Sequence, residues 1–114
     1  MKTITDVTAR VAAGQVKSEQ LTEECLIKIA ELDPKLNAFI TVTMDEALAQ
    51  ARAADRDIAA GRRIGPLHGI PISLKDLIDQ QGVRTTAGSL VRADHVATAD
   101  AVVTRRLRHA IPSI

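Results

Sequence analysis

One short segment constrains the fold of this chain more than any other, because it demands neighbours that the sequence hardly supplies. Residues 70–74 alternate so that Ile70, Ile72 and Leu74 share one face, which is the two-residue period of a β-strand. An isolated strand leaves its backbone donors and acceptors unpaired and its side chains uncovered. We therefore expect the opening part of a larger α/β unit, mostly helical as it stands.

Patterns before and after this segment predict four helices. Ser18 is a favourable N-cap, Thr43 and Glu46 have the spacing of a capping box, and Pro34 disfavours helical geometry in the residue before it. The expected helices run from Thr5 to Ala13, from Ser18 to Asp33, from Thr43 to Gly61, and from Ala99 to Ala110 with Thr98 as its cap. One domain is thus expected, with a helical part over 1–61, a strand and lysine loop over 62–90, and a helix over 98–110.

An apolar face along the second helix predicts how that helix packs. Leu21, Cys25, Ile29 and Leu32 recur at helical spacing, so we expect Cys25 to be a reduced thiol of the core. As the only cysteine, it has no partner for an internal disulfide. No apolar run is long enough to span a bilayer, and residues 1–13 lack the apolar core of a signal peptide. We therefore expect a cytoplasmic protein without a membrane partner.

Composition and charge argue against a nucleic-acid partner. The formal net charge is +1, whereas nucleic-acid-binding surfaces show a clear basic excess. Phe39 is the only aromatic residue, so the sequence lacks stacking platforms for single strands and its core must be aliphatic. The one basic cluster, Arg105, Arg106 and Arg108, indicates the solvated last turns of a helix, where cations are favourable.

Lys75 is the candidate for chemistry, because the apolar segment ends on it and a Gly/Thr/Ser loop follows. A lysine has an unperturbed pKa of about 10.4 and is protonated at neutral pH. Burial disfavours the ammonium form, so a lysine acts as a base only in a pocket that the rest of the protein closes. The competing interpretation is a solvated residue at the end of a strand.

Residues near Lys75 are weaker candidates. Ser73 lies on the same strand face, which permits a Ser–Lys pair. Asp76 is either a turn residue or a support for the lysine, and the hydroxyl side chains of residues 85–89 either line a pocket or make ordinary turns. His68 lies in a turn with no second ligand at metal-site spacing, so we expect neither a metal nor a cofactor.

Two blocks of sequence carry a specific resemblance. Residues 65–76 read Gly-Pro-Leu-His-Gly-Ile-Pro-Ile-Ser-Leu-Lys-Asp, and residues 85–89 read Thr-Thr-Ala-Gly-Ser. Together the blocks resemble the segments around the catalytic lysine of the amidase signature family, and further similarity extends from Val7 to Ala110.

This resemblance implies an α/β/α sandwich around a large mixed sheet, of which the chain forms the N-terminal portion. It also implies amide hydrolysis by a Ser–cisSer–Lys triad, without a cofactor. Only the lysine of that triad maps onto this sequence, as Lys75. The alternative within the family is the A subunit of the glutamine-dependent tRNA amidotransferase. Outside the family, the alternative is a non-catalytic helical interaction module.

The sequence departs from the family where the two serines are expected. It lacks the Gly-Gly-Ser-Ser-Gly-Gly segment and the later nucleophile, and after Arg108 it no longer follows the family pattern. Without a nucleophile or oxyanion donors, Lys75 has nothing to deprotonate. We therefore expect a truncated chain that is inactive alone. A small-molecule amide is the expected substrate of the completed site, and the expected protein partners are the missing C-terminal portion or a second copy.

Overall fold

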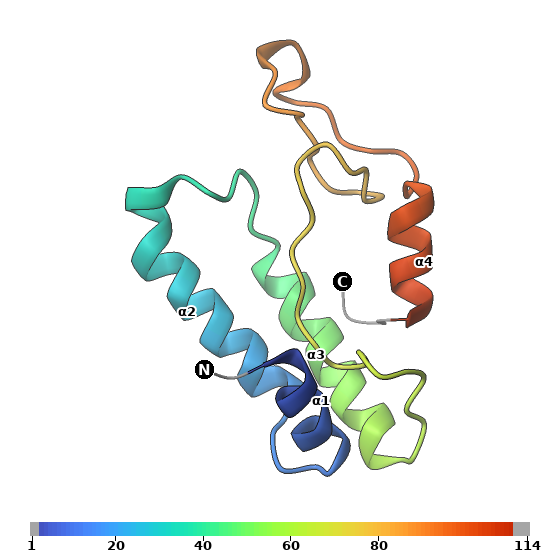
Figure 1. The fold of residues 1–114 in the computed structure, drawn as a ribbon. Helices are drawn as coiled ribbons and strands as arrows, with labels where there is room; N and C mark the ends of the chain where they lie inside the picture. Colours follow the sequence, from blue (N-terminus) through green and yellow to red (C-terminus); the bar gives the residue numbers. More distant parts are fainter. Residues whose placement is uncertain (1–2, 111–114) are drawn as a thin grey trace.

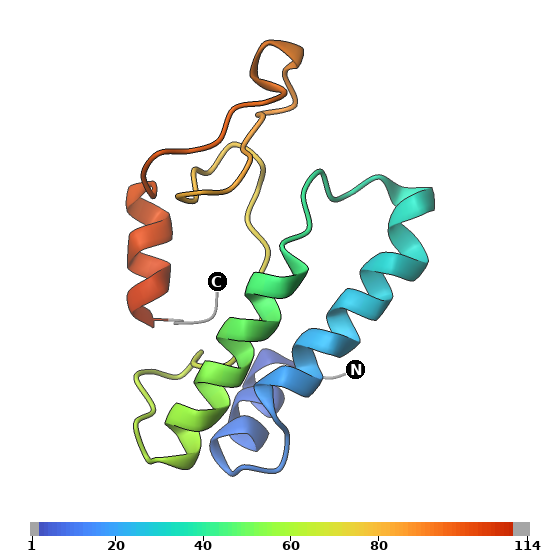
Figure 2. The ribbon, with the colours of Figure 1, turned by 180° about the vertical axis from the view of Figure 1, so that it is seen from behind.

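The computed structural model describes residues 3–110 and shows a helical first half followed by a largely irregular second half (Figure 1). Its elements are α1 (Ile4–Ala12), α2 (Ser18–Leu36), α3 (Met44–Ala59), the 3-10 turn η1 (Leu90–Arg92) and α4 (Val102–Ala110). Helices α2 and α3 pack together, and α4 lies on the opposite side of residues 70–78 from α2 in both views (Figure 1, Figure 2). No helix within 3–110 is long and apolar enough to cross a membrane.

Helix α1 begins where its sequence allows a reciprocal cap. The Thr3 hydroxyl accepts the Asp6 N–H at 3.2 Å, and the Asp6 carboxylate accepts the Thr3 N–H at 3.3 Å. These two bonds form a capping box and satisfy two donors at the helix start. The predicted first helix is confirmed, and Gly14 follows it with a φ of 67°, a conformation that costs glycine little.

Helix α2 is capped by another helix rather than by its own sequence. Ser18, predicted as the N-cap, is the first helical residue, and the cap position is Lys17. The Asp55 carboxylate of α3 instead accepts the N–H groups of Ser18 at 2.7 Å and Glu19 at 3.1 Å. A negative charge there also complements the helix dipole. Arg52 binds Glu19 at 2.6 Å beside this cap and adds a second link between the two helices.

The prediction that α2 stops at Pro34 is wrong, since the helix continues to Leu36. Proline in the last turn removes only one backbone N–H donor from the helix. The backbone N–H groups that follow the helix find an acceptor in a side chain. The Asp33 carboxylate accepts the N–H groups of Ala38 at 2.7 Å and Phe39 at 3.0 Å. Asn37, with a φ of 50°, takes the left-handed conformation that ends the helix.

Helix α3 begins at Met44 without the predicted capping box. Thr43 occupies the N-cap, but its ψ of 63° is not extended and its side chain makes no cap hydrogen bond. Glu46 accepts a hydrogen bond from Gln50 at 3.0 Å on the surface of the helix. The helix ends at Ala59, and Gly61 follows with a φ of 74°, so the predicted end is confirmed to within two residues.

The strand predicted over residues 70–74 does not form in the described part of the chain, which contains one isolated antiparallel bridge, between Arg84 and Val96. The segment runs as a single unpaired stretch, as Figure 1 shows in yellow. A strand requires a neighbour at hydrogen-bonding distance, and no described segment supplies one. The chain is therefore mostly helical, as expected, but without the first strand of an α/β sheet.

The hydrophobic core is small and aliphatic. Its buried residues are Val11, Val16, Leu21 and Ile70, with Val7 and Ile58 packed against them. Gly69 permits this contact, because a Cβ there would lie 3.2 Å from the Cβ of Ser18. The core therefore joins α1, the start of α2, the end of α3 and the beginning of the unpaired stretch.

The predicted burial of Cys25 is wrong. On the apolar face of α2, Leu21 is buried but Cys25 is exposed, and Leu32 is 48% exposed. Only the first turn of this face meets α1 and the core. Farther along this face, Cys25 and Ile29 line the open groove described below, whereas Leu32 lines a separate, smaller pocket.

Helix α4 begins at Val102, later than the predicted Ala99, and Thr98 is not its cap. The Asp79 carbonyl accepts the Ala101 N–H at 2.9 Å and the Thr104 hydroxyl at 2.7 Å, which holds the first turn of α4 to the loop. The predicted departure from the family pattern begins after Arg108, and its last four residues, 111–114, lie outside the described residues.

Candidate functional site

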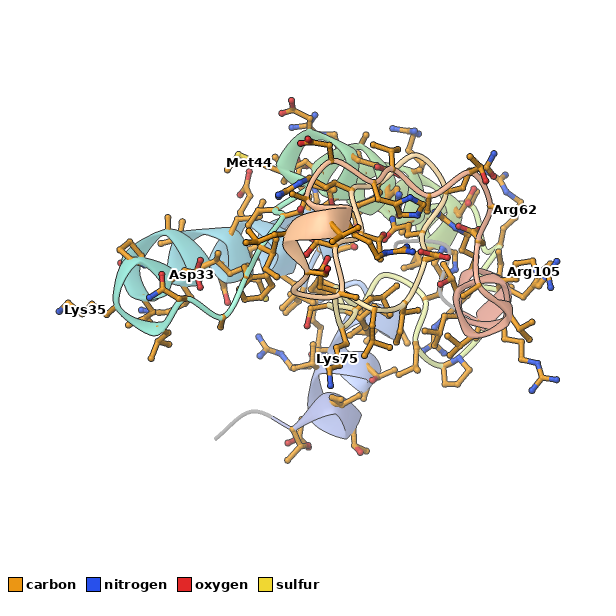
Figure 3. All side chains as sticks on the ribbon, turned by 90° about the horizontal axis from the view of Figure 1, so that it is seen from above. Asp33, Lys35, Met44, Arg62, Lys75 and Arg105 are labelled. Carbon is orange, nitrogen blue, oxygen red and sulfur yellow. The ribbon has the colours of Figure 1, made fainter. Side chains whose placement is uncertain are left out.

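Lys75 lies at the end of the unpaired stretch, where the chain turns toward the Thr-Thr-Ala-Gly loop. Its side chain is exposed. In Figure 3 it points toward the side of the molecule where α1 lies and not toward the helix that carries Arg105. The pocket that would desolvate the lysine is therefore not closed by residues 3–110.

Lys75 lines a broad open groove with a volume of about 1280 Å³. One wall comes from α1 and the uncovered apolar face of α2, and the other from the unpaired stretch and the loop after it. Most lining side chains are apolar, and those nearest the lysine in the chain belong to Ile72, Ser73, Leu74, Asp76 and Leu77. A concave, mainly apolar surface with a few polar groups is typical of a ligand or partner site.

Asp76 connects the lysine turn to the loop that follows. Its carboxylate accepts the Thr86 N–H at 2.9 Å, the Thr86 hydroxyl, and the Gly88 N–H at 3.3 Å. Its own carbonyl accepts the Ala87 N–H at 2.8 Å. The hydrogen bond from the Thr86 hydroxyl is the main reason that the pKa of Asp76 is lowered, with smaller effects from the Thr86 and Gly88 amides and from Arg84. The two blocks of the motif are therefore one hydrogen-bonded unit.

The other hydroxyl residues divide between the groove and ordinary turns. Thr85 lines the groove, is buried, and donates its hydroxyl to the Val83 carbonyl at 3.2 Å. Ser89 is half-buried, and its N–H donates to the Thr86 carbonyl at 3.0 Å, as in a turn. Ser73 is exposed and lines the groove, as Lys75 does, but Ile72 and Leu74 line it too, so the groove does not separate the two faces of the predicted strand.

His68 is fully buried and serves the turn before the unpaired stretch. Its Nδ1 accepts the Ile64 N–H at 3.1 Å, while its Nε2 is buried without a partner among the described residues. Burial lowers the pKa of His68, Asp57 opposes this effect, and Arg63 adds to it. Because Nδ1 acts as an acceptor, the neutral form of the ring fits this site.

The basic cluster and the acidic residues do not form a second site. Arg105 and Arg106 are exposed on α4, and Arg108 donates to the Asp100 carboxylate at 2.9 Å. Asp100 also accepts the Gln81 N–H at 2.7 Å, so it joins α4 to the loop. Within residues 3–110, no three His, Cys, Asp or Glu side chains gather as they would around a metal ion.

Comparison with known proteins identifies this arrangement. Residues 20–111 match the family model described as Amidase. The chain belongs to the Amidase family. Both the lysine turn and the Thr86–Gly88 loop lie within the matched amidase region.

Individual relatives agree with this membership. The chain is 47% identical over 105 residues to the A subunit of the Glutamyl-tRNA(Gln) amidotransferase of Chloroflexus aurantiacus, covering 92% of this chain and 22% of that relative. It matches the structure of the peptide amidase from Stenotrophomonas maltophilia with a TM-score of 0.86 and 42% identity, covering 95% of this chain and 23% of that one. A vestigial protein complex linked to the origins of an s-triazine catabolic enzyme matches with a TM-score of 0.88 and 36% identity, over 97% and 24% of the two chains. The chain therefore spans less than a quarter of the length of each of these three proteins.

Sequence reasoning missed two contacts that the fold creates between distant parts of the chain. No local pattern singled out Asp55, because its cap joins residues 36 and 37 positions apart. The sequence permits two interpretations of Asp76, a turn residue or a support for the lysine. In the structure it binds residues ten and twelve positions later in the chain. The available signal for Asp76 was its position directly after the lysine and shortly before a Thr/Gly loop.

Proposed function

We propose that this chain carries the proton-accepting lysine of an amidase-signature active site, and that both serines of the site come from protein beyond these 114 residues. The observation that carries the proposal is the position of Lys75. It lies in the matched amidase region, on an open groove, beside a loop that Asp76 holds.

In the proposed reaction, the nucleophilic serine passes its proton through the second serine to the neutral amine of Lys75. The serine oxygen then bonds to the amide carbonyl carbon. When the C–N bond breaks, the proton goes to the leaving nitrogen, and water later hydrolyses the acyl-serine ester. Lys75 supplies the proton acceptor, whereas the nucleophile and the oxyanion donors must be brought to the groove.

The exposure of Lys75 makes closure of the groove part of this proposal. A hydrated lysine is protonated at neutral pH, and its ammonium group cannot accept another proton. Desolvation favours the neutral amine, which can. The chain alone is therefore expected to be inactive. The proposed protein partner is the missing C-terminal portion, which would cover the apolar face of α2 and the unpaired stretch.

A fusion protein tests the proposal. Residues 1–110 replace the matching N-terminal segment of the Stenotrophomonas maltophilia peptide amidase, a substitution that 42% identity and a TM-score of 0.86 support. We expect ammonia release from a peptide amide, and a fall in kcat of about 10²–10⁴-fold on Lys75→Ala, the usual contribution of a general base. Lys35→Ala, at an exposed lysine in the last turn of α2, is the control. A folded fusion that is inactive, or one that keeps its activity without Lys75, would contradict the proposal.

A second candidate function is a part of a tRNA-dependent amidotransferase. The names of the relatives favour it, since the chain is 49% identical over 105 residues to the A subunit of the Glutamyl-tRNA(Gln) amidotransferase of Azotobacter vinelandii. The same lysine would then release ammonia from glutamine for transfer. An equivalent fusion with that relative separates the two functions by its preference for glutamine or for a peptide amide.

The non-catalytic alternative is a helical interaction module, acting through self-association or on another partner in the cytoplasm. Its test is the thermal unfolding of the chain alone. A cooperative, concentration-independent transition of a monomer favours the module. A broad, concentration-dependent transition favours an incomplete amidase domain, because the exposed apolar residues of the groove would then associate.

A further inference from the structure

Asp76 accepts four hydrogen bonds, and all of them link the two motif blocks. Its carboxylate accepts two bonds from Thr86 and one from the Gly88 N–H, and its carbonyl accepts the Ala87 N–H. All four bonds are accepted by Asp76, the residue that directly follows Lys75. They connect the lysine turn to three consecutive residues of the loop, so neither segment can shift without the other.

The loop that Asp76 holds is in an unfavourable backbone conformation. Ala87 has a φ of 52° and Gly88 a φ of 66°. The left-handed region is disfavoured for an alanine, and such residues persist where surrounding bonds determine them. Both of these residues, and Thr86 before them, donate hydrogen bonds to Asp76. The strained geometry is thus maintained directly beside the lysine turn.

We infer that Asp76 is a positioning residue, whose carboxylate and carbonyl lock the Lys75 turn against the Thr86–Gly88 loop and thereby set the place of the lysine on the groove. The inference rests on the proposed function of Lys75, and it adds a residue to which that function is sensitive. The competing explanation is that Asp76 only stabilises a surface loop. In that case its loss changes the amount of folded protein but not the chemistry of the folded fraction.

The charge state of Asp76 supports this role. Its pKa is lowered, mainly by the Thr86 hydroxyl, so the carboxylate stays ionised at neutral pH and accepts all three bonds. A neutral amide at this position keeps the shape of the side chain. However, Oδ1 of Asp76 accepts the Thr86 N–H and Oδ2 accepts the Gly88 N–H, so in either orientation the NH₂ group of an asparagine would face one of these two donors. Asp76→Asn therefore breaks the lock with little change in volume.

The first experiment measures hydrogen exchange of the Thr86 and Gly88 amides by NMR in the 114-residue chain. We expect the amide that faces the new NH₂ group to exchange about tenfold faster in Asp76→Asn, the scale of one lost hydrogen bond. Asp79→Asn is the matched control, because its carboxylate makes a 4.0 Å ion pair with Arg92 and does not contact either amide. Unchanged exchange in Asp76→Asn would show that these bonds do not hold the loop and would overturn the inference.

The second experiment measures kcat and KM separately in the peptide amidase fusion. We expect Asp76→Asn to lower kcat by about 100-fold, the cost of a misplacement of about 1 Å, with little change in KM. Thr86→Val should lower kcat in the same direction, and Thr86→Ser, which keeps the hydroxyl, should restore most of the loss. Circular dichroism at the assay temperature gives the folded fraction of each variant.

The outcomes separate the inference from the function on which it rests. If kcat per folded molecule is unchanged in Asp76→Asn while Lys75→Ala is inactive, Asp76 has only a structural role and the inference is wrong. If Lys75→Ala stays active, the proposed function fails, and the hydrogen-exchange result alone then decides whether Asp76 holds the loop.

Discussion

Residues 3–61 are held by helices that bury side chains against one another, whereas residues 62–110 are held mainly by carboxylates and carbonyls that bind backbone N–H groups. The first region contains most of the aliphatic core and the paired helices α2 and α3. The second contains Asp76, Asp79 and Asp100, each of which accepts hydrogen bonds from distant segments. The candidate for chemistry, Lys75, lies in the second region.

The two regions also differ in how they bury their side chains. The helical region has its own core, but it also leaves large apolar side chains exposed, among them Ile4 at 64% and Leu36 at 66%. The second region leaves Leu90 and Val91 more than nine-tenths exposed, at 93% and 96%. Polar bonds specify the shape of its loops, but they do not provide the burial that a functional lysine needs.

A matched pair of valines tests most directly whether the two regions are stabilised differently. Val11 is 1% exposed in the core, whereas Val91 is 96% exposed in η1. Val11→Ala should lower the free energy of unfolding by about 2 kcal/mol, from lost burial and the cavity left behind. Val91→Ala should change it by less than about 0.5 kcal/mol, as surface substitutions usually do. Urea titrations of both variants check this, and equal effects would mean that the two regions are not held differently.

A smaller effect should follow from removing the cap between α3 and α2. Asp55→Ala deletes the acceptor for the Ser18 and Glu19 N–H groups. The expected loss is about 1 kcal/mol, which is typical of a helix cap. Asp94→Ala, at an exposed aspartate of the second region, serves as the control in the same urea titration. A loss no greater than that of the control would show that α2 does not need this carboxylate.

The smallest expected effect is a pH dependence from His68, at the junction of the two regions. Its folded-state pKa is lowered from 6.5, mainly by burial. The unfolded chain therefore binds the proton more readily, and the stabilisation present above pH 6.5 is lost as the pH falls through the folded-state pKa. The lowered pKa values of Asp6, Asp76 and Asp100 act in a lower window, below their ordinary 3.8.

The check is the melting temperature between about pH 7.5 and pH 5, a range that spans the ordinary titration of histidine, compared with that of His68→Asn. Asparagine retains an acceptor for the Ile64 N–H but does not titrate, so the slope in this window should decrease. His109→Asn, exposed on α4, should leave the slope unchanged. An identical slope in His68→Asn would show that the buried ring does not couple to stability.

Sequence reasoning succeeded where one local pattern decides the outcome. Helical periodicity and glycine predicted the extents of α1 and α3, and two short motifs predicted the family. Sequence reasoning failed where contacts with other parts of the fold decide the local structure. Pro34 did not end α2, because Asp33 and Asn37 accommodated the end of the helix. Cys25 lies on the part of the apolar α2 face that the core does not cover. The strand at 70–74 lacked a partner.

The sequence by itself determined that this chain is an aliphatic, mostly helical portion of the Amidase family, with one lysine at a motif position. Those properties depend on residue type and spacing within a few turns of chain. The tertiary structure alone decided that Asp55 caps a helix 36 and 37 residues away and that Asp76 binds both motif blocks together. It also decided that Lys75 faces an open groove. Such contacts join residues that are distant in the chain, and only folding brings them within the length of a hydrogen bond.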